Sequence, residues 1–211
     1  MERRCTERGE ASVKKRILLG LISVFKALYN AVYAVMKLRP MQKKVVMISR
    51  QSNSQRPDFE QLGAEIEARD SGVRLVYLCR EMGDTPLELL RYCFHLLHCA
   101  AELSTAHVCI IDGYCIPVSV LHHRKELRVV QVWHALGAIK KFGRQALSVP
   151  GGRDKELAER MGMHKHYDAV LCASHRTAKA YEEAFGVSAD KMRVTGVPRC
   201  LLYTSDAADD K

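Results

Sequence analysis

The residues with the clearest chemical potential lie in one short stretch, VVQVWHALGAIKKFG, at positions 129–143. An apolar run leads directly to His134, and Gly137 and a later glycine flank Lys140 and Lys141. A histidine can take up a proton near neutral pH. Glycines permit a tight turn whose N–H groups, together with lysines, can hold an anion. The stretch therefore predicts a site that handles a phosphate, with a surface loop as the simpler alternative.

The elements that must position this stretch follow a regular alternation after Pro40. Short apolar runs rich in β-branched residues are separated by segments with helical spacing. Strands are expected at residues 43–49, 73–79, 106–112, 127–133, 167–174 and 191–197. Helices are expected at residues 59–70, 85–103, 154–163 and 177–186. This order is typical of an α/β fold, a Rossmann-like doubly wound parallel sheet, here spanning residues 41–199.

In such sheets, ligands bind beyond the carboxyl ends of the strands. The rule places His134 at the end of the fourth strand, where a general base would face a ligand. The other positions that it selects are Ser49–Arg50, Cys79–Arg80, Asp112–Gly113, Ser174–His175 and Pro198–Arg199.

Familiar nucleotide and hydrolase motifs do not occur. The sequence has no G-x-G-x-x-G after the first strand, no G-x-x-x-x-G-K-[ST] and no G-x-S-x-G. The residues of the segment 164–166 are expected to lie on the surface. We expect neither a cofactor nor a protein-bound metal.

The histidines of the second helix have a simple explanation. Its polar residues form one side, which is expected to face solvent, opposite Leu90, Phe94, Leu97 and Ala101. The polar residues in question are Glu88, Arg91, His95, His98 and Glu102.

The composition is that of one sizeable globular domain of 211 residues, with a formal net charge of +9. This charge is compatible with nucleic acid, an anionic membrane or a phosphate-rich substrate. The eight cysteines include no C-x-x-C pair. They are expected to be buried, reduced thiols in a cytoplasmic protein.

Residues 1–40 contain a long apolar segment with basic residues at both ends. Its polar residues are spaced 3, 4, 3 and 4 apart and form one helical stripe, namely Ser23, Lys26, Asn30, Tyr33 and Lys37. The pattern suits a helix in a membrane interface with its lysines towards the head groups. A helix packed on its own domain and a membrane-spanning helix are the alternatives. The position of the basic residues around one apolar helix favours lipid over nucleic acid.

Five stretches together resemble the CDP-glycerol glycerophosphotransferase family of teichoic-acid primases and polymerases. They are KKVVMISRQSN, CIIDGYCIPVS, VVQVWHALGAIKKFG, YDAVLCAS and RVTGVPR. The resemblance implies a peripheral enzyme on the cytoplasmic face of the cell membrane, with two Rossmann-like domains in a GT-B architecture. It also implies transfer of glycerol phosphate from CDP-glycerol to a hydroxyl of a lipid-linked glycerol-phosphate acceptor, with release of CMP.

The same resemblance implies roles for individual residues. His134 would deprotonate the acceptor hydroxyl, and Gly137, Lys140 and Lys141 would stabilise the phosphate. The remaining candidates for orienting substrate are Asp112, Ser174 and Arg199.

The last twelve residues, 200–211, depart from the family pattern. They are expected to form an unstructured tail of the kind that translated adapter sequence leaves, on a truncated chain that would be inactive alone. Three alternatives stay open: a donor such as CDP-ribitol, a nucleotide-sugar donor, and a non-catalytic module that binds anionic membrane. The sequence does not distinguish primase from polymerase or define the oligomeric state.

Overall fold

The computed structural model describes residues 2–135, 137–147, 149–150 and 152–198, with side chains from residue 13 onward. Its centre is a six-stranded, fully parallel sheet with the order β2-β1-β3-β4-β5-β6. The strands are β1 (Lys44–Ser49), β2 (Arg74–Cys79), β3 (Val108–Ile111), β4 (Arg128–Gln131), β5 (Ala169–Cys172) and β6 (Met192–Val194). Each lies inside the range expected from the sequence, so the doubly wound α/β fold is confirmed.

The apolar runs become strands because the sheet is covered on both faces. All six residues of β1 are buried, and this strand lies between β2 and β3. Its register pairs Val46 with Val76 on one side and with Cys109 on the other. A strand buried on both faces is a continuous apolar run rather than an alternating one.

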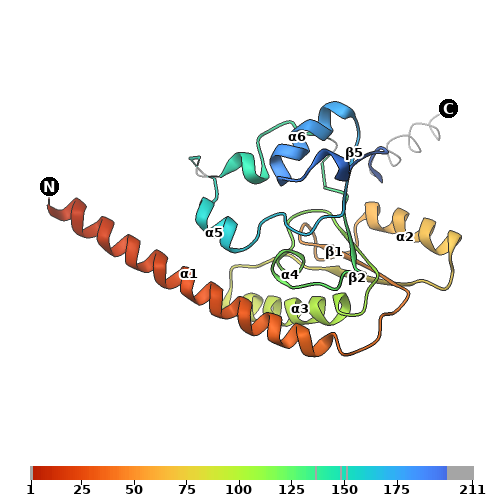
Figure 1. The fold of residues 1–211 in the computed structure, drawn as a ribbon, viewed down its shortest axis with the longest axis horizontal. Coiled ribbons are helices and arrows are strands. Elements are labelled where there is room, and N and C mark those ends of the chain that lie inside the picture. Colours follow the sequence, from red (N-terminus) through yellow and green to blue (C-terminus); the bar gives the residue numbers. More distant parts are fainter. Residues whose placement is uncertain (1, 136, 148, 151, 199–211) are drawn as a thin grey trace.

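Helices connect the strands and form the two outer layers (Figure 1). They are α2 (Pro57–Arg69), α3 (Pro86–Leu103), α4 (Ile116–Val120), α5 (Lys155–Arg160) and α6 (His175–Phe185), with single 3-10 turns at η1 (Gly143–Ala146) and η2 (Ala189–Lys191). Thr85 and Glu88 form a reciprocal capping box that starts α3, and Gly186 ends α6 in the left-handed conformation. The five-residue helix α4 was not expected from the sequence.

The helices cover both faces of the sheet, and the strand order shows where the chain reverses its direction across the sheet. Phe59 of α2 packs with Val45, Met47 and Ile110 on one face of the sheet. The helices α1, α3, α4 and α6 contribute to the core on the other face. The chain moves from β1 outward to β2 and then returns past β1 to β3, so the switch point lies between β1 and β3. Ligands of doubly wound sheets bind at this point.

The first helix, α1 (Glu2–Met36), lies against α3 and α5 and extends beyond the body of the domain (Figure 1). The expectation that its lysines point outward is wrong. Lys26 donates a hydrogen bond to the carbonyl oxygen of Arg160 at 2.7 Å, and Lys37 donates one to that of His122 at 2.7 Å. The polar stripe therefore faces the protein.

The reason is that this part of the domain presents unsatisfied helix-end carbonyl groups. The Asn30 amide donates to the carbonyl oxygen of Val120, the last residue of α4, and accepts from the N–H of His122. Arg160, which Lys26 contacts, is likewise the last residue of α5. The last carbonyl groups of a helix need such donors.

The apolar side of α1 consequently faces outward. Leu21, Leu28 and Val35 are 62%, 64% and 67% exposed. The segment Val13–Met36 has a mean hydropathy of 1.6 and is long and apolar enough to cross a membrane, with 17% of its most apolar part buried.

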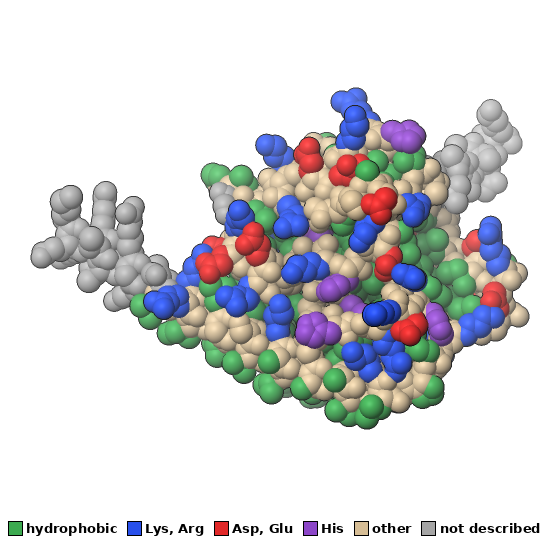
Figure 2. All heavy atoms as spheres, viewed as in Figure 1, with side chains coloured by type: hydrophobic (Ala, Val, Ile, Leu, Met, Phe, Trp, Pro, Cys, Tyr) green, Lys and Arg blue, Asp and Glu red, His purple; other side chains and the backbone are tan. Residues whose placement is uncertain are grey.

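The helix α3 adds to this exposed surface, which corrects a second expectation. Leu90, Phe94 and Leu97 are exposed rather than buried, because the core side of α3 is formed by other residues. Those buried residues are Tyr92, Leu96, Cys99, Ala100 and Leu103. Figure 2 shows hydrophobic side chains along the lower edge of the molecule, over α1 and α3. We call the exposed apolar side chains of α1 and α3 the apolar face.

The expected burial of the cysteines holds in most described positions. Cys99, Cys109, Cys115 and Cys172 are buried free thiols. Cys93 is exposed on α3, which differs from the expectation. Burial raises the pKa of the Cys115 thiol to about 12, so it stays protonated at neutral pH.

Candidate functional site

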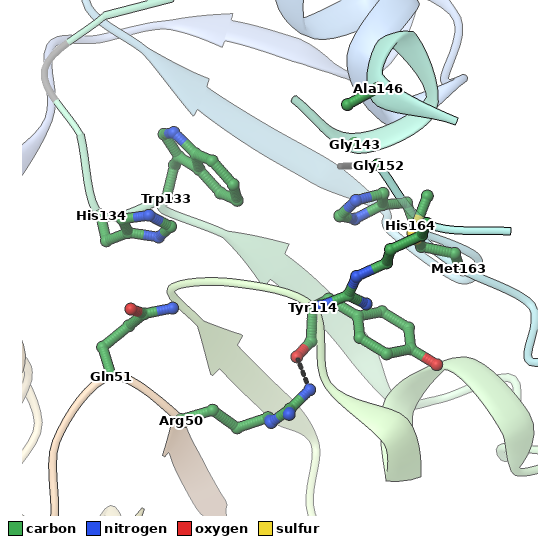
Figure 3. Close-up of a pocket in the computed structure, with 11 residues that line it drawn as sticks. Arg50, Gln51, Tyr114, Trp133, His134, Gly143, Ala146, Gly152, Met163 and His164 are labelled. Carbon is green, nitrogen blue, oxygen red and sulfur yellow. Dashed lines mark hydrogen bonds between the residues drawn. The ribbon is translucent and has the colours of Figure 1, made fainter. Parts of the chain in front are cut away.

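A cavity of about 380 Å³, which we call the site cavity, lies at the carboxyl edge of the sheet beside the switch point. Figure 3 shows His134 and Gln51 on one side of it, with His164 and Met163 opposite. Its lining consists of Arg50, Gln51, Tyr114, Trp133, His134, Gly143, Ala146, Gly152, Arg153, Met163 and His164. The predicted edge of the sheet is therefore hollowed around the predicted histidine.

The imidazole of His134 is held by the neighbouring strand end. Its Nδ1 lies 2.8 Å from the backbone carbonyl oxygen of Asp112. Because a carbonyl oxygen only accepts hydrogen bonds, Nδ1 carries the proton in the neutral ring and Nε2 carries the lone pair. The ring is thus set up to accept a proton at Nε2.

A buried glutamine shapes the chain that carries His134. The side-chain oxygen of Gln131 accepts from the backbone N–H of Trp133 at 2.9 Å, and its amide nitrogen donates to the carbonyl of Gly113 at 3.1 Å. Trp133 has a φ of 58°, a costly backbone conformation for a bulky residue. Gln131 therefore joins the two loops and stabilises the strained turn before His134. Sequence reasoning missed it, although a glutamine within an apolar strand was a visible signal.

Aromatic rings fold the later part of the turn back onto the sheet. The ring of Phe142 stacks on Trp133 with centroids 4.6 Å apart, and Phe185 contacts both rings from α6. The Trp133 ring also lies 4.1 Å from that of His134. These contacts limit the freedom of the imidazole without using its nitrogen atoms.

Asp112 is buried and is not among the residues that line the cavity. Its carboxylate is buried, accepts from the Ser49 hydroxyl at 2.6 Å and lies 3.4 Å from Nε of Arg56. Burial raises the pKa of Asp112, while Ser49 and Arg56 act in the opposite direction. Asp112 therefore supports the site through its carbonyl and this buried network.

The remaining candidates are distributed around the cavity. Lys140 and Lys141 are exposed on the turn and do not line it, and Gly137 lies on the same turn. Ser174 is exposed, and its hydroxyl accepts from the N–H of Thr177 as the cap of α6. Arg199 and the tail 200–211 lie outside the described residues. The roles of these residues stay predictions.

Two arginines supply the positive charge that the cavity does contain. Arg50 follows β1, at a position that the strand-end rule selected, and Arg153 precedes α5. The guanidinium groups lie 5.9 and 5.6 Å from the centroid of the Tyr114 ring. Arg153 lies far from any strand end in sequence and was not a candidate.

His164 was expected at the surface, and this expectation is wrong. His164 is 5% exposed and lines the site cavity. The backbone turns inward through positive φ values at Gly162 and His164, and Nδ1 of His164 lies 2.9 Å from the Tyr167 hydroxyl. Burial, with the charges of Arg153 and Arg144, lowers the pKa of His164 to about 3. The ring is therefore neutral at pH 7.

This shift predicts a pH-dependent stability. The unfolded chain binds a proton at this histidine below about pH 6.5, whereas the folded chain does so only near pH 3. His164 thus contributes stability that is present above pH 6.5 and is lost as the pH falls, by up to about 1.4 kcal/mol per pH unit. We expect the free energy of unfolding of His164→Asn, measured by urea unfolding at pH 4.5 to 7.5, to depend less steeply on pH than that of the unaltered chain. Asparagine is chosen because it tolerates the left-handed backbone at this position.

The control for this measurement is His175→Asn, which removes an exposed imidazole from α6. Equal pH slopes for His164→Asn and the unaltered chain would contradict the assignment of a neutral, buried ring.

The described residues contain no group of three His, Cys, Asp or Glu side chains placed to hold a metal ion. The described residues that line the cavity include two histidines, two arginines and the aromatic rings of Tyr114 and Trp133. This combination suits a ligand that is an anion and also has a proton to lose.

The fold and cavity define the chain as a Rossmann-like α/β domain with a cavity lined by two arginines beside its switch point. Comparison with known families then gives a direct assignment. The chain belongs to the CDP-Glycerol:Poly(glycerophosphate) glycerophosphotransferase family, whose sequence model matches residues 31–211.

Individual relatives come from teichoic acid biosynthesis. A teichoic acid ribitol-phosphate primase of Bacillus spizizenii is 28% identical over 180 residues, which cover 85% of this chain and 46% of the primase. A teichoic acid glycerol-phosphate primase of Bacillus subtilis is 29% identical over 104 residues, 49% of this chain and 27% of the primase. The chain thus spans less than half the length of these relatives.

The fold comparison agrees with the family assignment. The wall teichoic acid polymerase TagF matches with a TM-score of 0.63 at 12% identity, over 92% of this chain and 50% of TagF. A TagF variant soaked with CDPG matches with a TM-score of 0.62 at 11% identity. The domain has the fold of one Rossmann-like half of this GT-B architecture, preceded by the helix α1.

Proposed function

We propose that this chain forms the acceptor-activating half of an enzyme that transfers glycerol phosphate from CDP-glycerol to a hydroxyl of a lipid-linked acceptor in teichoic acid synthesis. The observation that carries the proposal is the orientation of His134, whose Nδ1–H is held by the Asp112 carbonyl at 2.8 Å. With the proton on Nδ1, Nε2 carries the lone pair that would remove the proton of a hydroxyl.

In the proposed step, Nε2 of His134 takes the proton from the acceptor hydroxyl. The hydroxyl oxygen attacks the β-phosphorus of CDP-glycerol, and the bond between this phosphorus and the oxygen bridging to CMP breaks. CMP leaves, and the glycerol phosphate is joined to the acceptor. Negative charge grows on the phosphoryl oxygens during attack, so nearby cations and N–H groups stabilise the transition state. Gly137, Lys140 and Lys141 are proposed to supply these groups from the turn.

The donor could instead be CDP-ribitol, and one observation favours this second candidate. The ribitol-phosphate primase matches 85% of the chain, whereas the glycerol-phosphate primase matches 49%. The test joins residues 1–198 to the carboxyl-terminal half of the ribitol-phosphate primase and measures CMP release from each CDP-alditol. Release from neither donor, by a chimaera that melts cooperatively, would contradict the proposed transfer.

We also propose that the apolar face lies on the cytoplasmic surface of the membrane as a peripheral anchor. Its leucines and valines repeat along α1, and burying such side chains contributes about 1.5 kcal/mol or more each. Lys14 and Arg16 are exposed residues of the same helix and would contact anionic head groups. An apolar patch of this extent is typical of an interaction surface.

The anchor predicts a large effect of three substitutions on one line of α1. We expect Leu21→Ser, Leu28→Ser and Val35→Ser together to lower binding to vesicles containing 30% phosphatidylglycerol by at least about 100-fold, because three exposed apolar side chains no longer enter the lipid. Vesicle flotation measures the change.

Substitution is a sharper test than removal of residues 1–40, because Tyr29 and Tyr33 of α1 belong to the core. The control is Val194→Ser, which alters an apolar side chain on β6, 40% exposed and away from the apolar face. Equal flotation of the triple variant and the control would remove the anchor.

A further inference from the structure

A second depression of about 630 Å³, which we call the apolar groove, lies next to the site cavity between α1 and α5. Its volume lies within the range of about 300–1,000 Å³ that small-molecule sites occupy. Its apolar lining includes Leu18, Leu21, Ile22, Phe25, Leu157 and Met161.

The groove shares residues with both the apolar face and the site cavity. Leu18 and Leu21 line it and are also exposed members of the apolar face. Arg50, Tyr114, Arg153 and Met163 line both the groove and the site cavity. The groove therefore borders the proposed membrane surface on one side and residues of the cavity that contains His134 on the other.

The junction of the groove and the cavity is positively charged. Arg50 and Arg153 both lie over the ring of Tyr114, within 6 Å of its centroid, which is the range of cation–π contact. Two guanidinium groups beside one ring repel each other, and an anion between them would relieve the repulsion.

The described residues do not supply that anion. Neither Arg50 nor Arg153 forms an ion pair with a described carboxylate. Asp154 lines the groove, but it pairs with Lys15 at 2.9 Å and caps α5. Nε of Arg50 is buried without a hydrogen-bond partner in the described part of the chain. Nη1 of the same guanidinium donates a long hydrogen bond of 3.4 Å to the Tyr114 carbonyl. Such a buried donor favours a ligand that accepts from it.

We infer that the apolar groove binds the hydrocarbon chain of a lipid phosphate, with Arg50 and Arg153 holding its phosphate at the junction. The apolar lining selects the chain, the two arginines select the anion, and the continuity with the apolar face provides entry from the bilayer. This inference rests on the proposed function, since it assigns a binding site to the lipid-linked acceptor. It orients the polar end of that acceptor towards His134.

Geranyl phosphate is a suitable probe, because it carries one phosphate and a short apolar chain. Trp133 is the single tryptophan of the chain and lines the site cavity, so its fluorescence reports binding next to the junction. We expect saturable binding at least 100-fold tighter than that of inorganic phosphate, since each buried CH₂ group contributes about fourfold. Geraniol, which lacks the phosphate, is expected to bind at least tenfold more weakly than geranyl phosphate.

Matched variants separate the two halves of the site. Arg50→Gln and Arg153→Gln are each expected to weaken geranyl phosphate at least tenfold, whereas Arg69→Gln on α2 leaves it unchanged. Leu18→Gln and Leu28→Gln alter exposed leucines of the same helix. Of these two leucines, Leu18 lines the groove and Leu28 does not. Leu18→Gln is expected to weaken geranyl phosphate at least fivefold without changing inorganic phosphate, and Leu28→Gln to change neither. Leu157→Gln provides a second groove variant on α5.

Equal affinities for geranyl phosphate and inorganic phosphate would overturn the inference. So would full affinity in both arginine variants, or equal effects of Leu18→Gln and Leu28→Gln. Failure of the proposed transfer would appear elsewhere, as absent CMP release from the chimaera, while geranyl phosphate still bound this chain. If the membrane anchor were wrong, Leu28→Gln would not change vesicle flotation. Geranyl phosphate would still bind the groove with unchanged affinity.

Discussion

Replacement of His134 by glutamine is expected to lower CMP release by a factor of about 10² to 10⁴ in the completed enzyme, with little change in donor affinity. A positioned general base contributes a rate factor of this size. Glutamine keeps a hydrogen-bonding side chain at the position but cannot take up a proton from the acceptor hydroxyl. The effect therefore belongs in kcat rather than in KM. Steady-state CMP release at several donor concentrations measures both.

The control for this substitution is His107→Gln. His107 precedes β3 at the opposite, amino edge of the sheet, and its Nδ1 lies 2.6 Å from the carbonyl of Gln42. The change removes an imidazole far from the cavity, so turnover should stay near that of the unaltered enzyme. If His134→Gln kept more than a tenth of the original turnover, His134 would not be the base.

Replacement of Asp112 by alanine is expected to destabilise the fold by about 3 kcal/mol. The substitution leaves Arg56 partly buried without this carboxylate and removes the acceptor of the Ser49 hydroxyl at 2.6 Å. The neighbouring carboxylate of Asp58, 3.6 Å from Arg56, retains part of the pairing. Urea unfolding followed by far-UV circular dichroism gives the free energy of unfolding.

Asp112→Asn separates charge from hydrogen bonding in the same network. Asparagine can still accept from Ser49, so a smaller loss of about 1–2 kcal/mol is expected. Because burial raises the pKa of Asp112, its contribution to stability falls as the pH rises above the ordinary range of a carboxyl. The asparagine variant should lose this part of the pH dependence. Asp84→Ala, at an exposed position, is the control and should change stability by less than about 0.5 kcal/mol.

An effect of Asp112→Ala no larger than that of Asp84→Ala would show that the buried network does not support the site. A loss of turnover in Asp112→Asn without a loss of stability would indicate that this carboxylate acts on His134 rather than on the fold. The two measurements together assign the role.

The succession of strands and helices along the chain was largely readable from the sequence. Continuous apolar runs alternating with helical segments specify a parallel sheet, because its strands are buried on both faces and need crossover helices. The carboxyl-edge rule then selected Arg50, Asp112 and His134, which the structure brings together around the switch point. These features follow from local periodicity and from chain order.

Other features depend on partners that are distant in the chain. The polar stripe of α1 could face water or protein, and the carbonyl ends of α4 and α5 decided the matter by binding Lys26 and Asn30. Polarity alone does not reveal which carbonyls lack a donor until the helices are packed.

The sequence by itself thus determined the α/β class and placed His134 at the carboxyl edge of the sheet, because these follow from periodicity and strand ends. The tertiary structure alone decided that α1 turns its apolar side outward, that His164 lies inside, and that Arg153 reaches the junction beside Arg50. Each of these three depends on contacts between segments far apart in the chain, and local spacing carries no information about such contacts.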